Sequence, residues 1–167
     1  MDPAQHIRIL QLTYAAQLAD SVVQYEKAGA LERVTEERRA MRLANGTAQA
    51  AQMGIAEPAA AFTTSAELFG CADWTVAVDG AEGPDAAGGL DRAGTAPMAT
   101  AAAPAFTATA HACLLCAMVK KAGGPSPCRL YCLDPIEAMV RGLSADARFD
   151  VEETLYDGAE CRVRVSS

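Results

Sequence analysis

Apolar residues near the start of the chain recur at steps of three and four, which is the spacing of one helix face. They are Ile7, Leu10, Tyr14, Leu18, Val22 and Tyr25. Asp2, Pro3 and Gln5 are typical of a helix start, because they supply a capping side chain, a first-turn proline and a capping-box partner. Gly29 is a typical stop signal. The pattern predicts a first helix that ends at about Gly29.

Polar and small residues divide the next part of the chain into further helices. Thr35 is the expected cap of a second helix that ends near Asn45-Gly46, and a short helix from Thr47 to Met53 follows,. Pro58 opens another helical segment that ends near Gly70,.

Strict alternation of apolar and polar residues then predicts strands. Residues 73–80 read "DWTVAVDG" and residues 105–111 read "AFTATAH". The second of these leads into a helix from about Cys113 to Ala122. Asp134 caps one more helix, whose apolar side carries Ile136, Met139, Val140 and Leu143,.

The C-terminal stretch "RFDVEETLYDGAECRVRV" predicts a β-hairpin,. A loop at 156–158, with Gly158 in the left-handed region, places Phe149 opposite Val165 and Val151 opposite Val163. The other face then holds two pairs of opposite charge, Asp150 with Arg164 and Glu152 with Arg162, and Leu155 faces Ala159.

The same register puts Glu153 on the apolar face, directly opposite Cys161. Desolvation raises the pKa of a carboxyl group toward the range that suits proton transfer, so Glu153 is a candidate acid or base. The alternative is that Glu153 lies at the sheet rim and reaches water or an arginine.

These elements predict an α+β fold in which an N-terminal helical layer packs on a small antiparallel sheet ending in a C-terminal hairpin. The 167 residues suit a single domain,. Within it, residues 1–70 are mainly helical, 80–104 form a flexible internal loop rich in Gly, Pro and Ala, and 105–167 form a cysteine-rich strand-helix-helix-hairpin part.

Charge narrows the possible partners. The net charge of −7 and the pI of about 4.8 argue against a nucleic-acid partner, because phosphate binding needs a basic face,. The sequence shows no secretory signal and no membrane span, so we expect a cytoplasmic protein,. Alanine-rich helices make a homodimer plausible.

Four of the six cysteines lie in residues 112–135, "ACLLCAMVKKAGGPSPCRLYCLDP". A metal site, a pair of disulfides, a nucleophile and simple packing are all compatible with this stretch. A cytoplasmic setting keeps thiols reduced, which disfavours disulfides. Thiolates at such spacing can bind zinc or an iron–sulfur cluster, and if a metal is present, the ligand set we expect is Cys113, Cys132, Cys161 and His111.

Cys113 falls where a strand turns into a helix, and a helix N-terminus stabilises a thiolate. That position suits a nucleophile or a catalytic metal ligand. Cys71 and Cys116 fit the role of small buried hydrophobes. His111 and Asp134 have structural alternatives, as a surface histidine and as a helix cap.

The C-terminal half resembles the L-2-amino-thiazoline-4-carboxylic acid hydrolase family. The residues that carry the resemblance are "TATAHAC" ending at Cys113, "CLDP" with Cys132 and Asp134, and "DGAEC" with Gly158 and Cys161. "VTEERRAMRLANGTAQAAQMGI", followed by a Trp-containing strand, is similar too. The family pattern has Cys-x-x-Asp where this chain has Cys-x-Asp. The hairpin is also similar to the small-molecule-binding domain named after vinyl reductases.

The resemblance implies a hydrolase that opens the carbon–nitrogen system of a cyclic, amidine-like thiazoline ring and gives N-carbamoyl-cysteine. The residues themselves allow a thiol-rich pocket made by Cys113, Cys132 and Cys161, with Glu153 as the acid or base candidate. The resemblance adds Asp134 as a further catalytic candidate. Either a thiolate attacks the ring or a thiolate-held metal activates water.

Two other hypotheses use the same cysteines. In one, the protein is a sensor or carrier that binds a small ligand or metal without turnover. In the other, a structural metal only stabilises the fold.

Overall fold

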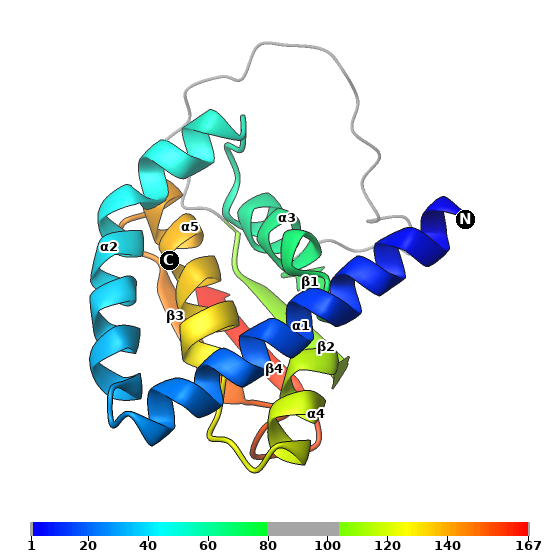
Figure 1. Cartoon of the computed structure of the whole chain (residues 1–167). Helices are drawn as coiled ribbons and strands as arrows, with labels where there is room; N and C mark the ends of the chain where they lie inside the picture. The colour runs from blue at the N-terminus through cyan, green and yellow to red at the C-terminus, as the bar shows by residue number, and fades with distance from the viewer. Residues whose placement is uncertain (1, 80–103, 167) are drawn as a thin grey trace.

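The computed structural model describes residues 2–79 and 104–166, which form helices packed on one side of an antiparallel sheet (Figure 1). The predicted α+β class with its C-terminal strand pair is confirmed. The helices are α1 (Pro3–Lys27), α2 (Leu31–Gln52), α3 (Pro58–Phe69), α4 (Leu114–Lys121), the π-helix η1 (Arg129–Leu133) and α5 (Asp134–Leu143). Apart from Pro104, the loop predicted at 80–104 lies outside the described residues.

The strands of the described residues form a four-stranded sheet in the order β1-β2-β4-β3. Their bounds are β1 Ala72–Val78, β2 Phe106–Cys113, β3 Arg148–Glu153 and β4 Cys161–Ser166. Alternate residues of the two central strands are buried, as period-two side-chain alternation requires when one face is covered,. The covered face packs around Phe62 of α3, whose ring lies 5.2 Å from the Trp74 ring and 5.7 Å from the Phe106 ring.

The stripe predicted on α1 is only partly used for packing. Ala15, Ala19 and Val22 are buried, whereas Ile7 and Leu10 are each 57% exposed. Within the described residues, no helix has both the length and the apolar composition needed to cross a membrane.

Helix α2 differs from the prediction, because it runs without a break through Thr35 and Gly46. Thr35 does not cap the helix; its hydroxyl donates to the Leu31 carbonyl oxygen at 2.8 Å inside the helix. Gly46 does not end the helix because it is buried against α5. A Cβ atom there would lie 2.0 Å from the Ala138 carbonyl oxygen. The glycine therefore allows two helix backbones to touch.

Asp134 does not cap α5, because η1 continues directly into that helix and Asp134 has helical dihedral angles. Pro135 has no N–H to donate to the preceding turn, and the turn before it is wider than an α-helical one,. The Asp134 side chain turns instead toward arginines of α2 and η1.

The hairpin prediction is correct for the outer pairs and wrong near the loop. Phe149 pairs with Val165, and Val151 pairs with Val163, as expected. The register then shifts, so Glu153 pairs with Arg162 and not with Cys161. Residues 154–160 connect the strands, in place of the predicted three-residue loop. Gly158 is not among the glycines with positive φ.

Candidate functional site

All six cysteines line one small apolar cavity under the start of α4. Each of them is a free thiol. The space between them measures about 10 Å³, which is room for about one water molecule or ion,. The six residues are Cys71, Cys113, Cys116, Cys128, Cys132 and Cys161.

The sheet and α4 explain why these sulfurs meet. Ala72 pairs with Cys113, which brings Cys71 beside the end of β2. Ala110 of β2 pairs with Cys161 at the start of β4. The Leu114 N–H donates to the Cys71 carbonyl oxygen at 2.7 Å and fixes the first turn of α4 against β1. Cysteines far apart in the sequence therefore lie together at one end of the sheet, where β1 and β4 begin and β2 ends, as we predict for Cys113 and Cys161.

Cys113 is the N-cap of α4 and is only partly buried. Its sulfur accepts the Cys116 N–H at 3.5 Å, so it takes the place that a capping oxygen usually fills,. Hydrogen bonds from the Cys116 thiol and then from the Cys71 thiol hold the pKa of Cys113 well below its ordinary value, although burial opposes the shift. Cys113 is therefore the thiolate candidate of the cavity.

Cys116 and Cys128 are the buried pair of the cluster, and their sulfurs lie 3.6 Å apart. Hydrogen bonding to Cys113 and then to Cys128 raises the pKa of Cys116, which stays a thiol and donates. The hydrogen bond from Cys116 lowers the pKa of Cys128. Burial raises the pKa of Cys161 to about 12, and its sulfur accepts the Leu155 N–H at 3.1 Å. Cys161 is consequently poorly suited to attack a substrate.

Cys113 faces outward as well as inward. It also lines an open cleft of about 470 Å³ between the starts of β1 and α4. The charged residues in the lining of this cleft are Arg8, Asp73 and Lys120. Such a volume is typical of small-molecule sites. A substrate in the cleft would meet Cys113 in front of the thiol cavity.

Three of the predicted site residues lie away from the cavity. His111 is exposed, with Nδ1 3.3 Å from a Glu160 carboxylate oxygen. The Glu153 carboxylate accepts the Ala159 N–H at 2.7 Å and does not lie opposite Cys161, because the register shift turns it toward the loop. Asp134 is buried in an ion-pair network with Arg39 and lines a different cleft.

The expected metal ligand set is not assembled. His111 is not part of the cavity. In the described part of the chain, no three His, Cys, Asp or Glu side chains are arranged to hold a metal ion. Cys113, Cys132 and Cys161 do share the cavity.

Sequence reasoning missed three members of the cluster. Cys71 and Cys116 were interpreted as packing residues, and Cys128 was assigned no catalytic role. Cys71 directly precedes β1, and Cys113 ends β2, so the two cysteines come together because these strands pair. The pairing of these two strands is a long-range property, which no local pattern specifies.

Glu153→Ala is expected to lower the free energy of unfolding by about 1 kcal/mol, because the Ala159 N–H loses its acceptor,. Glu153→Gln keeps an acceptor oxygen and is expected to match the unchanged protein. Urea denaturation followed by circular dichroism measures both. Equal stability of all three proteins would contradict the structural role of this contact.

No family model matches the chain, and neither the curated proteins nor the solved structures contain a match. Fold and geometry therefore carry the functional argument.

Proposed function

We propose that the protein is a hydrolase of small cyclic carbon–nitrogen substrates and that Cys113 is its nucleophile. One observation carries the proposal: Cys113 is partly exposed at the N-terminus of α4 and lines an open cleft of small-molecule size, where hydrogen bonds from neighbouring thiols lower its pKa. A thiolate is the reactive form of cysteine. The resemblance of the C-terminal half to the L-2-amino-thiazoline-4-carboxylic acid hydrolase family supports the same substrate class.

The first half-reaction uses the thiolate of Cys113. Its sulfur adds to the ring carbon between nitrogen and sulfur, and the ring C=N electron pair moves to nitrogen, which takes a proton. The tetrahedral adduct then breaks the bond between this carbon and the ring sulfur. The ring sulfur leaves as a thiolate, takes a proton, and leaves an isothiouronium group on Cys113.

The second half-reaction hydrolyses the covalent intermediate and regenerates the free enzyme. Water adds to the isothiouronium carbon and loses its protons as the carbon–Cys113 bond breaks. The products are a urea, as in N-carbamoyl-cysteine, and the Cys113 thiolate. The thiols of Cys116 and Cys71 stabilise that thiolate as a leaving group, through the hydrogen bonds that lower its pKa,.

The charges of the cleft suit a substrate that carries a carboxylate. Arg8 and Lys120 are the basic residues that line the cleft. The Lys120 ammonium donates to the Leu155 carbonyl oxygen at 2.9 Å, which holds it at the rim. Asp73 is the carboxylate that shares this cleft with Cys113, and it replaces Glu153 as the acid or base candidate.

A sensor or carrier of a small ligand or soft metal is the second candidate function. Its support is that six thiols line one cavity, since soft metals select thiolate ligands, although in the described structure no three of these side chains are arranged around one ion,. Zinc, another thiolate-bound metal or an iron–sulfur cluster would each be detected by elemental analysis of the purified protein. Metal in stoichiometric amount together with no turnover would favour this function over hydrolysis.

The direct test is incubation of the full chain with L-2-amino-thiazoline-4-carboxylate. A product that has gained one water molecule and one free thiol, detected by mass spectrometry and by thiol titration, supports the proposal. A panel of cyclic amidines without the carboxylate tests the contribution of Arg8 and Lys120. Absence of any ring-opened product from the whole panel would overturn the proposed activity.

Alkylation provides a test that needs no substrate. An ordinary exposed cysteine becomes about tenfold less reactive for each pH unit below its pKa, because only the thiolate reacts. The lowered pKa of Cys113 means that its thiolate persists below neutral pH. Its iodoacetamide rate constant is therefore expected to change by less than about threefold between pH 6 and pH 8.5.

Peptide mapping by mass spectrometry identifies the modified cysteine, and free cysteine serves as the reference thiol. A rate at Cys113 that rises with pH as steeply as that of free cysteine would contradict the assignment.

A further inference from the structure

A second cleft, separate from the one that Cys113 faces, lies between α2, the start of α5 and the β3 hairpin. Its volume is about 730 Å³, within the range of small-molecule sites,. We call it the acidic cleft, because its lining holds five carboxylate side chains and two arginines. The carboxylates belong to Glu32, Asp134, Glu137, Asp150 and Asp157, and the arginines are Arg39 and Arg129.

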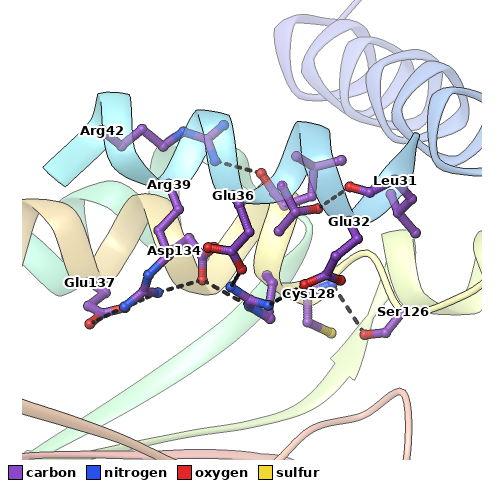
Figure 2. A network of polar contacts seen from close by, with 12 residues as sticks. Leu31, Glu32, Glu36, Arg39, Arg42, Ser126, Cys128, Asp134 and Glu137 are labelled. Carbon is purple, nitrogen blue, oxygen red and sulfur yellow. Dashed lines mark hydrogen bonds and ion pairs between the residues drawn. The ribbon is translucent and has the colours of Figure 1, made fainter. Parts of the chain in front are cut away.

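Arg39 is already fully engaged at the floor of the acidic cleft (Figure 2). It donates to both oxygens of Glu137, at 2.5 and 2.9 Å, and to Oδ1 of Asp134 at 3.0 Å. Figure 2 shows these contacts converging from α2 and α5. The bidentate pair with Glu137 uses the strongest geometry that a guanidinium offers. The hydrogen bond that Arg39 gives to Asp134 goes to Oδ1, and Oδ2 of that carboxylate receives none.

Asp134 is left with an unsatisfied oxygen. Its side chain is only 4% exposed, and Oδ2 is buried without a hydrogen-bond partner in the described structure. Burial raises the pKa of Asp134, although Arg39 and Arg129 oppose the shift. Buried carboxylate oxygens are normally paired, so a missing donor at the floor of a cleft points to a ligand that supplies one.

Arg129 is the movable group beside this carboxylate. Its side chain is 48% exposed, its Nε lies 3.7 Å from Asp134 Oδ1, and its closest ion pair is with Glu36 at 2.6 Å. The guanidinium thus lies among carboxylates in the way an external cation would. Oδ2 is shielded from bulk solvent, so a ligand can reach it only if a neighbouring side chain moves, and the half-exposed Arg129 is the neighbour suited to do so.

We propose that the acidic cleft binds a small organic cation, an amine or amidine carried on an apolar body. The Oδ2 oxygen of Asp134, which has no hydrogen-bond partner, and the excess of carboxylates over arginines in the lining favour a cationic ligand,. The rest of the lining supplies an apolar wall, formed by Leu31, Pro125, Leu130, Leu133, Phe149 and Val151. This site is independent of the proposed hydrolase chemistry at Cys113.

Benzamidine is a suitable probe, and benzamide is its neutral counterpart of nearly the same shape. Isothermal titration calorimetry on the full chain is expected to give benzamidine at least about tenfold tighter binding than benzamide. Asp134→Asn is expected to weaken benzamidine binding by about tenfold, because the buried charge is lost. Arg129→Ala is expected to tighten it by about threefold, because a competing cation is removed.

The two variants are predicted to change affinity in opposite directions, which a general loss of structure cannot do. Asp146→Asn, at an exposed position outside the lining, is the charge-matched control and should leave affinity unchanged. Cys113→Ala should also bind benzamidine normally, which separates this site from the hydrolase proposal. Equal binding of benzamidine and benzamide overturns the inference. If Asp134→Asn does not fold, unchanged or weaker binding by Arg129→Ala overturns it.

Discussion

Replacement of Cys113 by alanine is expected to lower ring-opening turnover by about 10³-fold or more, because covalent attack requires this thiolate. Cys113 combines a partly exposed sulfur with a lowered pKa. The other cysteine with a lowered pKa, Cys128, is buried, and the pKa of Cys161 is raised. No other thiol is equally placed to replace it. Turnover should be measured as thiol release from a 2-aminothiazoline carboxylate.

Two further variants distinguish the loss of the nucleophile from a change in the packing around it. Cys113→Ser nearly preserves the volume and still provides a capping oxygen for α4, yet it should lose as much activity as the alanine variant. Leu115→Val perturbs the wall of the same cavity without removing a thiol, and its turnover should stay within about threefold of the unchanged protein,. Activity that survives in Cys113→Ser would exclude this sulfur as the nucleophile.

Local patterns in the sequence were enough to predict most elements of this fold. Pro3 and Pro58 each lie at the first turn of a helix, and Gly70 ends α3 in the left-handed conformation,. The outer hairpin pairs followed from matching apolar residues across two strands. These features depend on neighbours in sequence or on one turn, so a single chain is sufficient to predict them.

The errors come from contacts between distant segments. Thr35 and Gly46 carry strong local signals for helix ends, but burial of α2 against α5 overrides both,. The register shift at Glu153 accompanies contacts in the hairpin loop, where the carboxylate itself binds the Ala159 N–H. No local sequence pattern predicts the burial of α2 against α5 or the register shift at Glu153.

The candidate site, like the fold, could be predicted from the sequence only in part. Cys113, Cys132 and Cys161, for which we predict a common pocket, do line one cavity, and the pairing of β2 with β4 brings the first and last of them together. The acidic cleft could not be predicted, because Arg39 and Asp134 are brought together only by the packing of α2 on α5 and by the π-helical turn that precedes Asp134. Each cleft nevertheless shares residues with the thiol cavity: Cys128 lines both the cavity and the acidic cleft, and Cys116 lines both the cavity and the cleft of Cys113.

The packing of α2 on α5 leads to the largest expected effect on stability. Gly46→Ala is expected to lower the free energy of unfolding by about 3 kcal/mol, at the upper end of the cost of overpacking. The added Cβ would lie 2.0 Å from the Ala138 carbonyl oxygen and 2.8 Å from its carbon, and backbone atoms cannot move aside as a flexible side chain can. Gly142 approaches from the other helix, where a Cβ would lie 2.5 Å from backbone atoms of Gly46 and Thr47.

An isolated helix would gain stability from this substitution, because alanine is the better helix former by about 1 kcal/mol. A loss of stability therefore reports the contact between the two helices and not the helix itself. Asn45→Ala is the matched control, since Asn45 is exposed one residue earlier in α2 and should change stability by less than about 0.5 kcal/mol,. Urea denaturation measures the free energy of unfolding of both variants. Gly46→Ala that is as stable as the unchanged protein would mean that α2 and α5 do not touch at this point. In that case the floor of the acidic cleft, which Arg39 of α2 and Glu137 of α5 build together, would not be formed as described.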